Sequence, residues 1–215
     1  KGPNAIWKID NRHVWIVGNA GYIYFCQNHH TGVTDSDAGI PTIQNLTDVH
    51  GYDTKNILAV GGNNAVVVTK DGGETWQFVV GPAGGVLLGC CWMWSADVWF
   101  VGEGAAGAGK LWLTVNRGKS WTEVTLPGSY VQIDKIGFIS EAEGYMSARD
   151  AGKSYILKTI TAGNQWVVLP EGKRATPIAN TYLDDLAVCS KYANTAFAAG
   201  LASNGTSGII VKMTA

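Results

Sequence analysis

Short apolar segments separated by turn-forming residues recur along the chain. Between residues 47 and 80, such segments cover 47–52, 57–61, 65–69 and 76–80, and the gaps between them are rich in Gly, Asp, Asn and Lys. Short apolar runs that are bounded by turn formers are typical of β-strands, whereas a helix needs a longer run with a period of about 3.6 residues. The pattern therefore predicts four short strands in this stretch.

A segment that ends in tryptophan returns three times at a fixed spacing. It reads Thr69-Lys-Asp-Gly-Gly-Glu-Thr-Trp76, then Thr114-Val-Asn-Arg-Gly-Lys-Ser-Trp121, then Thr159-Ile-Thr-Ala-Gly-Asn-Gln-Trp166, and successive tryptophans lie 45 residues apart. A Val-Gly pair also recurs at 17–18, 60–61 and 101–102, and Ala199-Gly200 stands in the matching place near the end. A fixed period in this range indicates stacked supersecondary units.

Repeated four-stranded units with glycine turns predict an all-β chain with a β-propeller fold. We expect one propeller domain over residues 1–215, built from five four-stranded blades of about 43 residues. Alignment on the Val-Gly pairs places the blades at approximately 4–41, 42–84, 85–128, 129–181 and 182–215.

The last blade is expected to be incomplete in this chain. Its strand-like segments lie at 196–200 and 209–213, and the sequence stops at Ala215, where the tryptophan hairpin of the other units would turn. Three alternatives account for this: residues upstream supply a closing strand, a partner chain supplies it, or further blades follow.

The tryptophan segment has the composition of a hairpin turn. An Asp or Asn there accepts hydrogen bonds from amides of its own turn, Gly adopts positive φ, and the Trp covers the turn with a large apolar face. The third copy carries Thr161 at the acidic position, and residues 28–33 hold only an eroded copy. The residues expected to be structural are Thr69, Asp71, Gly73, Trp76, Thr114, Asn116, Gly118, Trp121, Thr159, Gly163 and Trp166.

This motif resembles the Asp-box, or BNR repeat, of β-propellers such as the sialidases and the photosystem II assembly factors. The resemblance covers roughly residues 42–170 and is weak at both ends. In that family the Asp-box is structural and lies on the face away from the active centre. The resemblance therefore implies a fold and leaves the activity open.

Composition and charge narrow the class of partner. The chain is 46% hydrophobic and 15% charged, with 28 Gly and 9 Trp, and its formal net charge is −1. This charge gives no global field to attract a polyanion, so nucleic acid is not an expected partner. No apolar run reaches the roughly 20 residues that cross a bilayer, so we expect no membrane insertion.

The first residue is Lys1 rather than Met. No charged-then-apolar leader follows it, so we expect a processed product or a piece of something longer. An extracellular or virion-surface location is favoured.

Several segments resemble chemical sites without completing them. Gly104 to Lys110 matches the spacing of a phosphate-binding loop, but Leu111 follows where Ser or Thr is needed, and a glycine-rich hairpin is favoured. A sialidase needs three arginines around the substrate carboxylate, and one of the few arginines present falls inside a tryptophan segment. The four arginines are Arg12, Arg117, Arg149 and Arg174. We therefore expect no catalysis, although carboxylate pairs such as Asp184-Asp185 leave hydrolase activity open.

No metal or cofactor is expected. His29 and His30 are adjacent, so in extended chain they point to opposite sides, and no acidic spacing completes a site. The four cysteines, Cys26, Cys90, Cys91 and Cys189, form no CxxC pair and fall in strand-like segments, which favours buried thiols over disulfides. The Trp92-Met93-Trp94 run is expected to pack in the core, with a sugar-stacking platform as the alternative.

Loops between second and third strands, together with connections between blades, usually form the binding face of a propeller. These segments carry Asn, Ser and Gly with few charges, which suits hydrogen bonding to hydroxyls or to the backbone of another protein. The candidate binding residues are Asn19, Asn63, Asn64, Lys110, Lys153, Lys173, Arg174 and Asn204.

The sequence favours a non-catalytic binding or structural module of a larger assembly, such as a virion component or a surface attachment protein. Its expected partners are proteins, with a homo-oligomer or a glycan as further possibilities. The alternative is a carbohydrate-binding propeller lectin, for which aromatic and Asn residues would have to recur at equivalent blade positions. A photosystem assembly factor-like protein or a glycosidase is a further alternative, but the strong arginine patch and the seven blades of the assembly factors are not visible.

Overall fold

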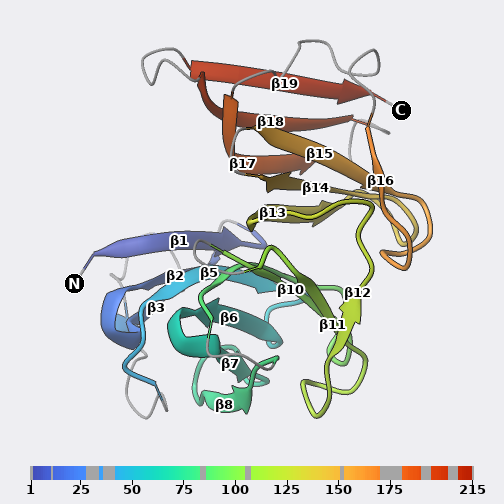
Figure 1. Ribbon diagram of the computed structural model, residues 1–215. Coiled ribbons are helices and arrows are strands. Elements are labelled where there is room, and N and C mark those ends of the chain that lie inside the picture. Colours follow the sequence, from blue (N-terminus) through green and yellow to red (C-terminus); the bar gives the residue numbers. More distant parts are fainter. Residues whose placement is uncertain are drawn as a thin grey trace. The chain divides into compact units, whose positions relative to one another are not determined.

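The computed structural model describes residues 2–10, 12–27, 34–35, 42–82, 86–104, 108–150, 153–169, 181–189, 195–202 and 208–214. Within these stretches the strands form five sheets (Figure 1). The strands of each sheet are neighbours in chain order, as expected for repeated meanders.

The first sheet contains β1 (Pro3–Lys8), β2 (His13–Gly18), β3 (Ile23–Gln27) and β4 (Thr34–Asp35). The second contains β5 (Leu46–Gly51), β6 (Ile57–Gly61), β7 (Ala65–Thr69) and β8 (Gln77–Val80). The third contains β9 (Leu88–Met93), β10 (Trp99–Glu103), β11 (Leu111–Thr114) and β12 (Thr122–Val124). The fourth contains β13 (Gln132–Phe138), β14 (Gly144–Arg149), β15 (Ser154–Thr159) and β16 (Val167–Val168). The fifth contains β17 (Thr181–Cys189), β18 (Thr195–Ala202) and β19 (Gly208–Thr214).

The prediction of five repeated strand units, the last one incomplete, is confirmed. Four sheets have four strands, and the fifth has three among the described residues. In the second sheet, the predicted strand bounds agree with β5 to β8 to within one residue. The only helical segments in the described part of the chain are two 3-10 turns, η1 (Asn19–Gly21) and η2 (Gly62–Asn64), and none is long and apolar enough to cross a membrane.

The chain divides into two compact units. The first unit holds residues 1–101 and 112–122, and the second holds residues 102–111 and 123–215. The boundary passes through the third sheet, whose strands β10, β11 and β12 each contribute residues to both units. Each unit has buried apolar clusters of its own.

Apolar side chains of neighbouring sheets pack face to face within each unit. In β6, Ile57 and Ala59 join a cluster with the first sheet, whereas Leu58 and Val60 join a cluster with the third. Successive side chains of a strand point to opposite faces, so a strand covered on both faces becomes a continuous apolar run. This is why β6 is buried at every position and shows no polar alternation.

Side chains of the first strands also bond to the backbone of the next sheet's first strand. In the first unit, Asn4 Nδ2 donates to Leu46 O at 2.8 Å and Thr47 Oγ1 donates to Leu88 O at 2.5 Å. Asn4 and Thr47 lie at register shifts of β1 and β5, where a bulged residue turns out of the ladder. The bulges therefore connect successive sheets as well as bending their own strands.

Two further bonds of this kind join β5 to β9. Asp48 Oδ2 accepts the amide of Cys91 at 2.9 Å, and His50 Nδ1 accepts the amide of Met93 at 3.1 Å. Both acceptors lie on the strand that carries the Thr47 bulge. Since a buried amide without an acceptor is costly, these side chains help to set the register between the second and third sheets.

The three tryptophan segments share one turn geometry. Thr69 Oγ1, Thr114 Oγ1 and Thr159 Oγ1 each accept the amide of the glycine four residues later, at 2.9, 2.9 and 3.1 Å. The residue two positions after each threonine accepts the amide of the residue four positions further on, at 2.9 Å in every copy. These acceptors are Asp71, Asn116 and Thr161. Two side-chain acceptors thus replace the backbone partners that the turn lacks.

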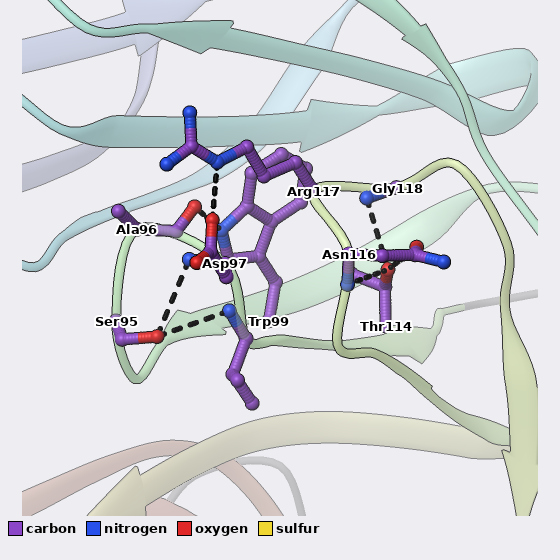
Figure 2. Close-up of polar contacts among 9 residues, drawn as sticks. Ser95, Ala96, Asp97, Trp99, Thr114, Asn116, Arg117 and Gly118 are labelled. Carbon is purple, nitrogen blue, oxygen red and sulfur yellow. Dashed lines mark hydrogen bonds and ion pairs between the residues drawn. The ribbon is translucent and has the colours of Figure 1, made fainter.

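Two consecutive residues in each of these turns have left-handed backbone. They are Gly72 and Gly73 (φ +81° and +106°), Arg117 and Gly118 (+61° and +75°), and Ala162 and Gly163 (+56° and +80°). The first residue of each pair donates its amide to the turn between the first and second strands of the same sheet, at Lys55 O, Asp97 O or Ala142 O. Figure 2 shows the second copy, where an Arg117–Asp97 ion pair reinforces this contact.

The tryptophans that follow these turns differ in their partners. Trp121 Nε1 donates to Val80 O at 2.9 Å and Trp166 Nε1 to Gly163 O at 3.0 Å, whereas the buried Trp76 Nε1 has no hydrogen-bond partner among the described residues. Trp76 and Trp166 are buried, and Trp121 is half-buried. Apolar contact is therefore the property that the three tryptophans share.

Candidate functional site

The predicted binding residues of the first unit lie on the turns between second and third strands. Asn19 belongs to η1, where its Oδ1 accepts Asn4 Nδ2 at 2.9 Å. Asn63 is exposed in η2 with φ +51°. Asn64 donates its amide to Val86 O at 2.6 Å and its Nδ2 to Pro82 O, so it fixes the connection to the third sheet. Asn204, Lys173 and Arg174 lie outside the described residues.

Lys110 is the predicted residue that lies at a cavity. The cavity has a volume of about 300 Å³ and lies within the second unit, between the start of β11, the end of β12 and the connection to β13. We call it the Lys110 pocket. It is lined by Ala108, Gly109, Lys110, Glu123, Val124, Thr125, Leu126, Gly128, Ser129 and Tyr130.

An ion pair crosses the β11–β12 side of the Lys110 pocket. Lys110 Nζ lies 2.7 Å from Glu123 Oε2, and the two side chains are 39% and 47% exposed. The hydrogen bond to Glu123 raises the pKa of Lys110 above its ordinary value, and the charge of Glu103 acts in the same direction. An exposed pair of this kind contributes little to stability, so its groups can exchange partners when a ligand arrives.

Glu103 organises the loop that forms the other side of the pocket. Its side chain is buried, with 3% of the residue exposed, and Oε2 accepts the amide of Ala108 at 2.7 Å. The Glu103 amide donates to Lys110 O at 2.9 Å, which closes the loop into a hairpin. Leu111 then begins β11, and the described residues of the segment, 104 and 108–110, include no helical turn, so the hairpin interpretation agrees with the described part of the loop.

Gly109 brings this loop against Tyr130. It has φ +62°, and a Cβ there would lie 2.3 Å from Tyr130 O. No other residue type fits a left-handed position with that approach. Tyr130 itself is 6% exposed, and burial, followed by the charges of Tyr155 and Asp150, raises the pKa of its phenol.

The β14–β15 turn extends the site beyond Tyr130. The Tyr130 and Tyr155 rings meet edge to face with centroids 5.5 Å apart. Tyr155 Oη donates to Asp150 Oδ2 at 2.6 Å, which raises the pKa of Tyr155, and Lys153 Nζ lies 5.1 Å from the Tyr155 ring centroid. The structure therefore brings Lys110 and Lys153 to one set of aromatic residues in the second unit.

The aromatic and cysteine candidates are not among the residues that line the Lys110 pocket. Met93 is 2% exposed and belongs to the core, while Trp92 stacks on His50 with ring centroids 3.9 Å apart. Cys90 and Cys91 are buried and Cys26 is half-buried, without disulfides among them. Cys189 lies in β17.

Two of the arginines considered for a sialidase site form ion pairs with aspartates. Arg117 pairs with Asp97, and Arg149 pairs with the buried Asp134 at 2.6 Å. Arg12 is exposed near Asp10, and His29 and His30 lie outside the described residues. Among the described residues no cluster of three His, Cys, Asp or Glu side chains has the geometry of a metal site.

Glu123, Tyr130 and Tyr155 were not anticipated from the sequence. Glu123 follows a tryptophan segment, and its lysine partner precedes the same segment, so the pair spans the whole β11–β12 hairpin. A cross-strand charge pair at the two ends of a predicted hairpin is a signal that was available in the sequence. Tyr130 lies in a blade connection and has no equivalent in the repeat, so no pattern identifies it.

Comparisons with known proteins support the fold. No protein-family model and no curated protein sequence matches the chain. Among solved structures, YCF48 bound to a D1 peptide aligns with a TM-score of 0.50 at 12% identity, over 99% of this chain and 93% of that one. YCF48 from Cyanidioschyzon merolae aligns with a TM-score of 0.68 at 14% identity, over 99% of this chain and 66% of that one.

Two other kinds of propeller align over 99% of this chain. The GH74 enzyme of Niastella koreensis gives a TM-score of 0.71 at 16% identity, and the WD40 repeats of RRP9 give 0.69 at 10%. The chain spans 35% of the GH74 enzyme and 67% of the RRP9 chain. Structural similarity at such low sequence identity is evidence for the fold alone. The chain thus has a β-propeller fold of five blades, the last of them incomplete.

Proposed function

We propose that this chain is a non-catalytic β-propeller that binds a segment of a partner protein at the Lys110 pocket. The observation that supports the proposal is the lining of the pocket. It combines the half-exposed Lys110–Glu123 ion pair, the buried Tyr130 and the backbone of residues 108–110. Groups of this kind recognise a side chain and its flanking backbone.

The size of the pocket favours a peptide as the ligand. A volume of about 300 Å³ takes one long side chain or a small ligand rather than a folded element. The similar fold of YCF48 was solved with a D1 peptide, so a propeller of this kind can hold a peptide. Recognition of one anchor side chain in a small pocket is a common mode for transient protein partners.

We also propose that the three tryptophan turns are Asp-boxes. The shared pair of acceptors, the shared left-handed residues and the buried or half-buried tryptophans support this assignment. The turns lie at the strand ends that do not contribute to the Lys110 pocket, which agrees with a structural role. Assignment to a virion component or surface attachment protein is a prediction from the sequence alone.

The test is selection of peptides from a displayed random library against the whole chain, followed by mapping of the bound peptide with amide chemical shifts. We expect shifts concentrated at residues 108–110 and 123–130. Tyr130→Leu removes the phenol but keeps an apolar side chain, and it should weaken binding by about tenfold. Tyr52→Leu, at an exposed tyrosine of the first unit, is the matched control and should bind normally.

Two outcomes would overturn the proposal. One is a library that yields no binder, and the other is a binder whose shifts map away from the Lys110 pocket.

A photosystem assembly factor-like role is a second candidate, because the fold is similar to YCF48, and specific binding of a D1 peptide would favour it. Heat on titration with common hexoses would favour the lectin instead, and turnover of a fluorogenic sialoside would favour a glycosidase.

A further inference from the structure

Negative charge exceeds positive charge around the Lys110 pocket. Glu123 lines the cavity, and Glu103 holds the amide of its wall residue Ala108. Two ammonium groups lie nearby, and both already have partners: Lys110 with Glu123 at 2.7 Å, and Lys153 over the Tyr155 ring. Among the lining residues the charges of Lys110 and Glu123 balance, while Glu103 behind the loop and Asp150 and Lys153 on the adjoining turn add two carboxylates and one ammonium group.

The walls of the pocket suit a long amphipathic side chain. Val124 is buried and Leu126 is half-buried, so an aliphatic stem has apolar surface to cover. Gly128 lies against the phenol end of Tyr130, since a Cβ there would be 3.1 Å from Tyr130 Oη, and both residues line the pocket. A cation beside a phenol oxygen and an aromatic edge-to-face pair is a favourable arrangement.

We infer that the Lys110 pocket accepts a basic side chain, arginine or lysine, from the partner segment, an inference that rests on the proposed function. The stem of that side chain packs on Val124 and Leu126, and its cationic head competes with Lys110 for the Glu123 carboxylate. Arginine is the stronger competitor, because its planar fork binds a carboxylate through two parallel hydrogen bonds whereas an ammonium acts as a point charge.

An acidic side chain fits the same pocket poorly. It would have to approach the Glu123 carboxylate, and the Lys110 ammonium that would receive it is already bonded to Glu123. Repulsion between like charges at an interface disfavours the wrong partner and so contributes to specificity. The charge balance therefore selects a cation.

The experiment uses two probes, N-acetyl-arginine amide and N-acetyl-glutamate amide, titrated separately into the whole chain and followed by amide shifts of residues 108–110 and 123–130. We expect the arginine probe to shift these amides and the glutamate probe to leave them in place. Glu123→Gln should weaken arginine binding by about five- to tenfold, because it removes the charged acceptor. Lys110→Gln should tighten it severalfold, because it removes the competitor.

The control is Glu141→Gln, an equally conservative change at an exposed turn of the same unit, which should leave binding unchanged. A glutamate probe that shifts the pocket amides more than the arginine probe, or weaker arginine binding by Lys110→Gln, would overturn the preference for a cation and leave peptide binding intact. If neither probe shifts these amides while a selected peptide does, the basic anchor is wrong. If the selected peptide also fails, the proposed function itself is wrong.

Discussion

At the scale of single residues, backbone conformation explains the composition of the tryptophan turns. Each turn needs two left-handed residues in a row, and the second is glycine in all three copies. The first is Gly72, Arg117 or Ala162, although a side chain at such a position costs about 1 kcal/mol. Arg117 also forms an exposed ion pair with Asp97 (Figure 2).

Ala162 carries this backbone cost at φ +56°, so Ala162→Gly should stabilise the protein by about 0.5–1 kcal/mol. The reciprocal change Gly72→Ala should destabilise it by about 1–2 kcal/mol, since φ is +81° there and the new Cβ would lie 3.0 Å from Thr54 O. Urea unfolding at neutral pH measures both. Effects of the same sign in the two variants would contradict the explanation from backbone strain.

The carboxylate of Asp71 makes the first of these turns sensitive to acid. Burial by itself would raise the pKa of Asp71, but hydrogen bonds from Thr69, Thr75 and Gly73 outweigh it and lower the pKa from 3.8 to about 2. The unfolded chain therefore binds the proton more readily than the folded chain. The contribution of Asp71 to stability is complete above about pH 4 and is lost as the pH falls towards 2.

Asp71→Asn should remove this acid-dependent part while keeping the turn, because Asn116 already occupies the equivalent place, where its Oδ1 accepts the Ser120 amide and its Nδ2 donates to Ser120 Oγ. The side chain is exposed, so we expect a change below about 1 kcal/mol. The reciprocal Asn116→Asp should add acid dependence to the second turn. Unfolding free energies between pH 7 and pH 2.5 test both, and identical pH profiles for all three proteins would refute the assignment.

At the scale of strands, contacts between sheets are made by side chains as well as by apolar packing. Asp48 reaches from β5 to the amide of Cys91 in β9. Asp48→Ala leaves that buried amide without this acceptor, so we expect a loss of about 1–3 kcal/mol. Asp48→Asn keeps an acceptor oxygen and should lose less. Urea unfolding compares the two, and equal losses would show that the hydrogen bond contributes nothing beyond the charge.

Some strands could be predicted from the sequence, whereas contacts between sheets could not. The runs that became β6 and β7 were recognisable because both faces of these strands are buried, so their apolar residues are contiguous. The Thr47 bulge and the Asp48 bond were not, since each depends on the register with another sheet and not on any local preference. Of the residues that line the Lys110 pocket, the sequence identified Lys110 alone as a candidate. Glu123 lies beside it because of hairpin pairing, and Tyr130 because of a blade connection, and neither contact is visible in a local pattern.

At the scale of the whole molecule, the sheets differ in how completely their strands are paired. In the fourth sheet β15 lies between β14 and β16, whereas in the fifth sheet β19 pairs with β18 alone among the described residues. Amides of an edge strand that face away from their partner have no ladder acceptor. The fifth blade is therefore expected to be the least stable part of the second unit.

Native-state hydrogen exchange tests this expectation strand by strand. We expect the β19 amides to exchange through local opening at a lower free energy than the β15 amides, which should approach the global unfolding value. Strand β11, which lies between β10 and β12, is the internal control and should behave like β15. Slow exchange of the amides along the whole of β19 would mean that its outer edge is paired in solution. If the pairing strand comes from a second copy of the chain, the exchange rates of these amides would depend on protein concentration.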